Sequence, residues 1–161
     1  MYKVLVHTDI ILQHLLHDKN SKSILREAQK KVFCYTTVFN AIEIFSICKE
    51  SNEFYFAQEA MSSMKILGLN SKNAKVYGKM YGENSLRSFN TLIATLSLES
   101  KLPILTTQPK EFKGTNVSII SSADIFKYET AEEIINLNKK IKNNLFQHYF
   151  TNIFYIWRTK T

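Results

Sequence analysis

The chain has 161 residues, a length that favours a single domain with a real hydrophobic core. Apolar residues make up 45% and charged residues 22%, as in ordinary globular proteins, while only 4 glycines and 2 prolines argue against a sandwich rich in tight turns. The formal charge of +7 and the pI near 9.3 favour a polyanionic partner, although lysine-rich proteins with no such partner share these values.

The two cysteines, Cys34 and Cys48, indicate buried reduced thiols, because neither has a second Cys or His at zinc-binding spacing. The N-terminus lacks a basic region followed by a long apolar stretch, so we expect no signal peptide. No apolar run approaches the roughly 18 residues that a membrane span requires. We therefore expect a cytoplasmic protein without a membrane partner.

The first predicted element is a buried strand over residues 4–6. The polar residues His7, Thr8 and Asp9 follow it, and either Thr8 or Asp9 is suited to cap the helix that comes next. The inward residues of that helix are predicted to be Ile11, Leu12, Leu15 and Leu16. A strand that ends in a polar turn places those polar residues at the carboxyl edge of a sheet, where open α/β folds bind ligands.

Helices and strands alternate along the rest of the chain. We predict helices over residues 19–31, 38–50, 52–67, 71–81 and 88–100, and strands over residues 32–35, 102–107 and 117–120. Such alternation implies a short, mainly parallel sheet with helices on both faces, which is a three-layer α/β/α fold. We expect this domain to span residues 1–125, with a C-terminal helical extension over residues 126–161.

The helix over residues 38–50 is capped by Thr36 or Thr37. Its own side chains are apolar on nearly every side, so we expect it to be buried. The helix over residues 88–100 is separately expected to bury Phe89. Glu43 lies in its middle, and a buried carboxylate is costly unless it is paired. Glu43 is therefore a candidate site residue.

Basic residues outnumber acids between residues 65 and 87. They are Lys65, Lys72, Lys75, Lys79 and Arg87, with Tyr77 and Tyr81 among them. A phosphate-binding surface and a solvated helix face explain this pattern equally well. Our candidate nucleic-acid-binding residues are Lys72, Lys75, Lys79 and Arg87, together with Thr106 and Thr107.

An aromatic stripe lies in the C-terminal extension. Its members recur at helical spacing and are Phe146, Tyr149, Phe150, Ile153, Phe154 and Trp157. The stripe favours packing on the chain's own domain or on a dimer partner over stacking on bases.

Four stretches in chain order carry a family resemblance: VLVHTDIIL, TTVFNAIEIF, SFNTLIATLSLE and LPILTTQPKEF. They resemble the four sequence blocks of the PIN domain, the fold of VapC-type toxin ribonucleases, over residues 1–120. The resemblance implies an acidic cluster that holds Mg²⁺ or Mn²⁺, orients water for attack on RNA, and belongs to a toxin paired with an antitoxin.

Three positions that match the family's acids carry other residues here: His7, Asn90 and Gln108. Among the four matching positions, only the one at Glu43 still has an acidic residue. Asp9 is a further acid, two residues after His7. Neutral ligands do not replace the charge that Mg²⁺ requires, and a protonated histidine repels cations. We therefore expect no metal cofactor. If activity remains, Glu43 and Asp9 are the catalytic residues and the ligands of Mg²⁺ or Mn²⁺.

Each of these residues also has a structural interpretation. Asp9 is favoured as a helix cap, and Glu43 could form an ion pair with His7 in place of a metal. Thr106 and Thr107 could bind a phosphate or hold the edge of their strand.

Three functions follow. The first is a PIN-like homodimer that binds RNA or an antitoxin-like protein without cleaving RNA. The second is an active Mg²⁺- or Mn²⁺-dependent ribonuclease toxin. The third is a protein-interaction module that uses the aromatic C-terminal helix.

Overall fold

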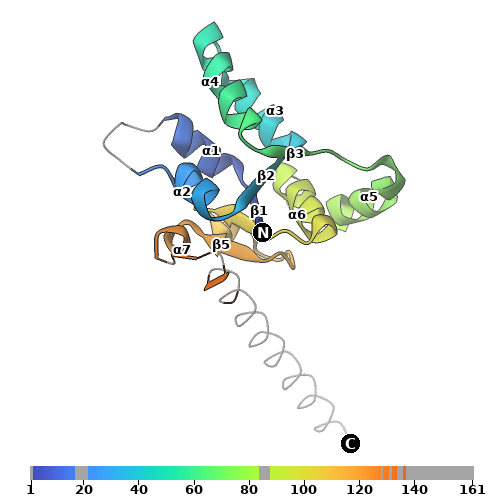
Figure 1. The fold of residues 1–161 in the computed structure, drawn as a ribbon. Helices are drawn as coiled ribbons and strands as arrows, with labels where there is room; N and C mark the ends of the chain where they lie inside the picture. The colour runs from blue at the N-terminus through green and yellow to red at the C-terminus, as the bar shows by residue number, and fades with distance from the viewer. Residues whose placement is uncertain are drawn as a thin grey trace, which may run out of the picture.

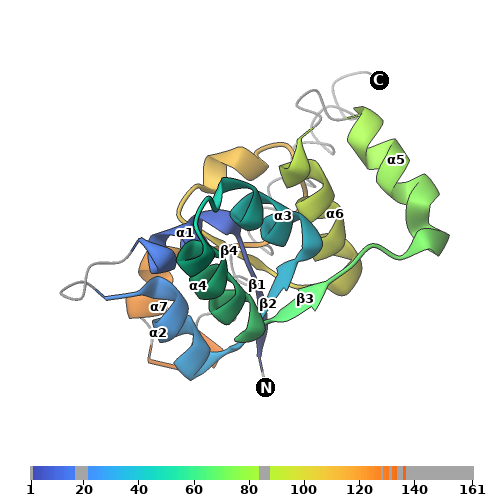
Figure 2. The same cartoon turned by 90° about the horizontal axis from the view of Figure 1, so that it is seen from above.

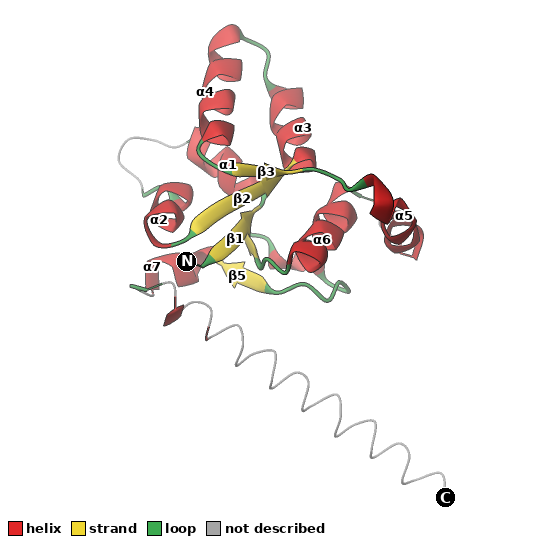
Figure 3. Cartoon of the chain, turned by 45° about the vertical axis from the view of Figure 1, so that its right-hand side comes forward, coloured by secondary structure: helices red, strands yellow, loops and turns green. Residues whose placement is uncertain are grey.

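The computed structural model describes residues 2–16, 22–83, 88–127, 129–130, 132–133 and 136. Within them, five strands form one sheet in the order β3-β2-β1-β4-β5, and every pairing is parallel. Helices lie against both faces of the sheet (Figures 1 and 3). The predicted three-layer α/β/α fold is confirmed.

The strands are β1 (Lys3–Val6), β2 (Phe33–Thr37), β3 (Lys65–Leu67), β4 (Ile104–Thr106) and β5 (Ile119–Ser121). The helices are α1 (Thr8–Leu15), α2 (Ile24–Lys31), α3 (Val38–Ile47), α4 (Ser51–Ser62), α5 (Ala74–Glu83), α6 (Phe89–Ser100) and α7 (Ser122–Lys127), with 3₁₀ turns η1 (Ser71–Asn73) and η2 (Pro109–Phe112).

The central strand β1 divides the core into two halves. Val4 and Val6 point into the half built with α1, α2, α4 and α7, whereas Leu5 points into the half built with α6. All three side chains are fully buried, because β1 has a neighbouring strand on each side and helices on both faces. The carboxyl end of β1 therefore lies at the centre of the sheet edge.

The predicted cap of α3 is confirmed at Thr37. Its hydroxyl accepts the backbone N–H of Asn40 at 3.2 Å, and the side-chain oxygen of Asn40 accepts the N–H of Thr37 at 3.2 Å. The predicted cap of α1 is wrong, since His7 is the N-cap residue and makes no capping bond with its side chain. Asp9 is not the cap because its carboxylate is turned towards β4.

Other predictions require correction. Residues 65–67, expected at the end of a helix, form the edge strand β3, because they pair with the outer edge of β2. Helix α3 is not buried all round, since Ile42 and Ile47 are about half exposed. Phe89 and Leu16, both expected to be buried, are 40% and 83% exposed. Leu16 is exposed because α1 ends at Leu15.

Helices α3 and α4 form a hairpin that projects from the body of the molecule (Figures 1 and 3). The rings of Phe45 and Phe54 stack between the two helices, with centroids 6.4 Å apart. Cys34 and Cys48 are free thiols, as predicted, but only Cys34 is buried, whereas Cys48 is partly exposed. Among the described residues, no helix has the length and apolar character needed to cross a membrane. Arg87 and the aromatic stripe lie outside the described residues.

Substitution of one buried and one exposed leucine tests the contribution of the core to the free energy of unfolding. Leu5→Ala is expected to lower the free energy of unfolding by about 2–5 kcal/mol, because it opens a cavity beside the central strand. Leu16→Ala is the control and should change it by less than about 0.5 kcal/mol. Urea denaturation followed by circular dichroism measures both, and equal losses would contradict this assignment of the core.

Candidate functional site

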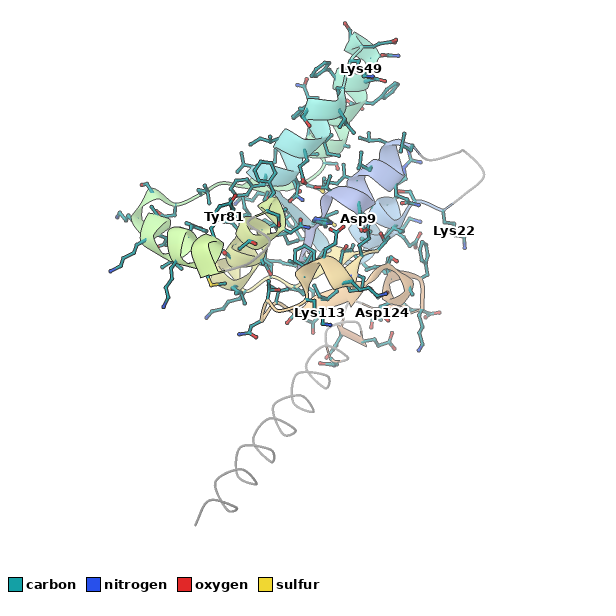
Figure 4. All side chains as sticks on the ribbon, turned by 180° about the vertical axis from the view of Figure 1, so that it is seen from behind. Asp9, Lys22, Lys49, Tyr81, Lys113 and Asp124 are labelled. Carbon is teal, nitrogen blue, oxygen red and sulfur yellow. The ribbon has the colours of Figure 1, made fainter. Side chains whose placement is uncertain are left out.

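Four elements bring polar side chains to the carboxyl edge of the sheet. His7 follows β1 directly, Asp9 lies in the first turn of α1, Asn90 lies in the first turn of α6, and Glu111 lies in η2. Figure 4 labels Asp9 in the midst of side chains from neighbouring elements. The edge that the sequence predicted as the ligand-binding edge is therefore where these residues meet.

The imidazole of His7 joins these residues in one hydrogen-bonded chain. His7 Nδ1 lies 3.1 Å from Asp9 Oδ1, and His7 Nε2 lies 3.0 Å from Asn90 Oδ1. The amide nitrogen of Asn90 donates to Glu111 Oε2 at 2.9 Å. We call Asp9, His7, Asn90 and Glu111 the His7 network. Because oxygen acceptors face both ring nitrogens, the network suits a doubly protonated imidazolium.

The ion pair in this network is buried. The His7 and Asp9 side chains are only 6% and 10% exposed. The ring of Phe112, at the end of η2, packs against His7 edge to face, with centroids 5.1 Å apart. A pair shielded from water in this way is screened less by salt than a pair on the surface.

Asp9 accepts hydrogen bonds at both carboxylate oxygens. Oδ2 accepts the Thr106 hydroxyl at 2.8 Å and both the N–H and the hydroxyl of Thr107, at 2.7 and 2.5 Å. Oδ1 accepts the backbone N–H of Ile10 at 2.8 Å in addition to His7. The two threonines therefore fasten α1 to the end of β4 through Asp9.

Glu43 is bound by a different partner from the one predicted. Its Oε2 accepts the hydroxyl of Thr8, and that hydroxyl in turn accepts the side-chain amide of Asn40 at 2.8 Å. The predicted pair of Glu43 with His7 is wrong, because His7 already faces Asp9 and Asn90. Glu43 is half-buried, and it links α3 to the start of α1.

The pKa values of the two residues in the ion pair shift in opposite directions. Burial alone would raise the pKa of Asp9, but hydrogen bonds from His7, Thr107 and Thr106 outweigh it and lower this pKa to about 2. Burial alone would lower the pKa of His7, but the hydrogen bond and charge of Asp9, with contributions from Asn90 and Glu111, raise it above 6.5. Both shifts favour the charged forms, which are the carboxylate of Asp9 and the imidazolium of His7.

The side chains at this edge are poor ligands for a hard dication such as Mg²⁺. His7 occupies the position at which the PIN sequence blocks have their first acid, and it favours the cationic imidazolium. The Asp9 carboxylate already accepts five hydrogen bonds. Among the described residues, no three His, Cys, Asp or Glu side chains gather as they would around a metal ion. Mg²⁺ prefers several anionic oxygens that are free to bind it.

Other predicted site residues lie elsewhere. Gln108 is exposed, and its backbone N–H donates to the Thr106 hydroxyl at 2.9 Å. Lys72 lies in η1, and Lys75 and Lys79 lie in α5, outside the His7 network. Arg87 lies outside the described residues.

A carboxylate on α6 holds the basic helix. Glu99 accepts hydrogen bonds from the Tyr77 hydroxyl and from the side-chain amide of Asn73. Burial, with the adjacent Glu99, raises the pKa of Tyr77 to about 12, so this hydroxyl stays protonated. Tyr77 is buried whereas Lys72 and Lys75 are exposed, so the basic side chains point away from the body.

Two residues of the site were missed from the sequence. Glu111 completes the His7 network, and Asn40 supports the Thr8–Glu43 link. Glu111 could have been found from its place in the turn after β4, next to Phe112. Asn40 had a weaker signal, because an asparagine three residues after a threonine cap is explained by the cap alone.

No protein-family model matches this chain, and no curated protein matches it by sequence. Solved structures share its fold. A toxin–antitoxin complex from Klebsiella pneumoniae aligns with a TM-score of 0.54 and 17% identity, over 69% of this chain and 91% of that chain. VapBC2 from Rickettsia felis, bound to a promoter DNA fragment, aligns with a TM-score of 0.57 and 16% identity, over 74% and 96%. This chain has the PIN-domain fold.

The PIN fold explains why the four resembling stretches converge at one sheet edge. At these identities the likeness extends to the fold alone, so the chemistry has to be argued from the residues at that edge. In this PIN fold the edge holds a histidine–carboxylate pair.

The ion pair predicts a stability maximum between about pH 4 and pH 6.5. The contribution of Asp9 is complete above its ordinary pKa of 3.8 and is lost as the pH falls towards about 2. The contribution of His7 is complete below 6.5 and is lost as the pH rises through its raised pKa. Urea midpoints across this range measure the profile.

Two variants separate the acidic and alkaline declines in stability. His7→Gln should remove the alkaline decline, and Asp9→Asn should weaken both limbs. A wild-type profile that is flat on the alkaline side, and unchanged in His7→Gln, would contradict the charged state of His7.

Proposed function

We propose that this chain is a PIN-fold, toxin-like protein that binds RNA and does not cleave it. The observation that carries the proposal is the buried ion pair of His7 with Asp9, at the edge where the resemblance puts catalytic acids. Metal-assisted hydrolysis needs a cation that orients water and neutralises charge building on the phosphate. Here the cationic group is the side chain of His7, so no metal cofactor belongs to the proposal.

The imidazolium is poorly suited to replace the metal in catalysis. Both of its N–H groups are directed at oxygens of the protein, Asp9 on one side and Asn90 on the other. A general acid has to reach the substrate with its proton. The network therefore supports a structural role for His7, which is to neutralise Asp9 and to join β1 to α6.

The basic face of α5 supports RNA as the partner. Lys72 and Lys75 are exposed, and the contacts of Tyr77 and Asn73 with Glu99 fix the inner face of this segment on α6. Exposed lysines on a fixed helix can contact successive phosphates. With Lys79 and Arg87 they form the proposed RNA-binding set. Thr106 and Thr107 leave this set, because both are bonded to Asp9.

A protein partner is the second candidate. Both structural neighbours described above are toxin–antitoxin complexes, which favours an antitoxin-like protein as a ligand of this chain. This candidate requires no RNA affinity. The predicted homodimer and cytoplasmic location remain predictions under either candidate.

Incubation with labelled RNA and Mn²⁺ tests the absence of cleavage. We expect no products, because the proposed site lacks a group of anionic ligands for the ion. Products that appear with the wild type and vanish with Glu43→Gln would instead establish a metal-dependent ribonuclease.

The His7→Asp variant tests, without RNA, whether the wild-type site lacks the ligands to bind a metal ion. It should be less stable than the wild type, because it places a second carboxylate beside Asp9, and added Mn²⁺ should raise its Tm. The wild-type Tm should not respond to Mn²⁺. A rise in the wild-type Tm that equals the rise in the variant would contradict the proposal.

Salt-dependent binding tests the RNA surface. Replacing Lys72 and Lys75 by Ala should weaken binding of single-stranded RNA and reduce the slope of log K against log salt by about 0.7 for each lost phosphate contact. The matched control is Lys22→Ala, since Lys22 lies on the side of the molecule opposite Tyr81 of α5 (Figure 4). Equal effects of the control, or no binding by the wild type, would leave the antitoxin-like protein as the favoured partner.

A further inference from the structure

Helix α4 exposes an aromatic surface beside a carboxylate. Tyr55 and Phe56 are each 59% exposed, and their rings meet edge to face with centroids 5.7 Å apart. Glu59, one turn further along the same face, is also exposed. The carboxylate of Glu53 is not part of this surface, because it accepts the backbone N–H groups of Lys49 and Glu50 at the start of the helix. We call Tyr55, Phe56 and Glu59 the α4 face. Large exposed aromatic groups rimmed by charge are typical of a contact surface.

The α4 face is acidic, whereas the end of the chain is basic. Residues 50–64 contain three glutamates and no Lys or Arg. Residues 134–161 contain five basic residues and no Asp or Glu, so residues 1–133 hold the other 16 basic residues and all 14 acids. Most of the chain's +7 charge therefore belongs to the same short segment that carries the aromatic stripe.

We propose that the α4 face is the docking site of this chain's own residues 146–157. The stripe of that segment, ending in Trp157, covers Tyr55 and Phe56, and the lysines and arginine on either side of the stripe approach Glu59. Burial of aromatic rings supplies the attraction, and the opposite charges orient the segment along α4.

Helix α7, the last described helix, is linked to α4 through α2, while α4 itself projects away from α7 (Figure 1). Lys31 at the end of α2 donates to the carbonyl oxygen of Ile125 in α7 at 2.6 Å, and Gln29 of α2 donates to Ser63 Oγ, just after α4, at 2.7 Å. Helix α2 thus bridges α7 and α4, and Figures 1 and 2 show these three helices along one side of the molecule. Phe56 precedes Ser63 by two helical turns and lies on the same edge of α4.

The lengths agree with this placement. Helix α7 packs on α2, and packed helices lie about 8–10 Å apart. Phe56 lies about 10 Å further along α4 than Ser63, the residue that α2 contacts. The 18 residues between Lys127 and Phe146 span about 27 Å as a helix and at most about 60 Å when extended, so the connection suffices in either form. Residues 146–157 and α4 both have 12 residues, which is about 18 Å as a helix.

Docking within one molecule is favoured over docking between two. A segment tethered by a short connection has an effective concentration in the millimolar range, far above that of a second copy in dilute solution. This contact is independent of the His7 network and of α5, so it goes beyond the proposed function.

Trp157 reports on the contact in the full-length chain, because it is the only tryptophan. We expect a blue-shifted emission and weak acrylamide quenching in the wild type. Replacing Tyr55 and Phe56 by Ala should shift the emission to the red and raise the quenching constant several-fold. These residues are mostly exposed, so the variant should keep the circular dichroism spectrum and Tm of the wild type.

Glu59→Lys is the second variant and should move the emission in the same direction, with an effect that shrinks as salt is added. Val76→Ala is the control, since Val76 is 55% exposed on α5 and should change nothing. Emission that stays blue-shifted in both α4 variants would overturn the proposal, as would a solvent-exposed Trp157 in the wild type. Emission that depends on protein concentration, with the mass of a dimer, would overturn docking within one chain.

Discussion

The buried contact between the imidazolium of His7 and the carboxylate of Asp9 is the interaction on which the carboxyl edge of the sheet depends. Through Asp9 it fastens the start of α1 to the end of β4, and through Asn90 and Glu111 it reaches α6 and η2. A buried charge is tolerated only where hydrogen-bond partners and an opposite charge surround it, and here His7 and Asp9 neutralise each other. The charges at this edge are therefore balanced by protein side chains. This balance is why we favour binding over hydrolysis for a chain whose fold is shared with toxin–antitoxin complexes.

Much of this arrangement could be predicted from the sequence. The β-branched run of β1, the threonine cap of α3 and the alternation of helices with strands led to the three-layer fold, because each is a local pattern with a local cause. The position of His7 among the matching acids also led to the correct sheet edge. What could not be predicted was the choice of partner. His7 pairs with Asp9, two residues away, and not with Glu43, because the carboxylate of Asp9 is drawn inward by Thr106 and Thr107, 97 and 98 positions along the chain.

Burial was harder to predict than secondary structure. Apolar residues on every side of α3 indicated an internal helix, but α3 and α4 leave the body together as a hairpin, so Ile42 and Ile47 reach the surface. Residues 65–67 follow the apolar period of α4, yet they form β3, since the open edge of β2 offers hydrogen-bond partners that a longer helix would leave unused. In both cases the deciding neighbours are remote in sequence, and helical periodicity contains no information about them.

The attachment of α5 has a consequence for how this protein tolerates change. A single acid, Glu99, holds both Tyr77 and Asn73, although it contributes no positive charge itself. The direction in which the lysines of that helix point is thus decided on α6, by a residue that a survey of basic side chains would pass over. Substitution of Glu99 would therefore weaken the attachment of α5 to α6 while leaving every lysine of the chain unchanged.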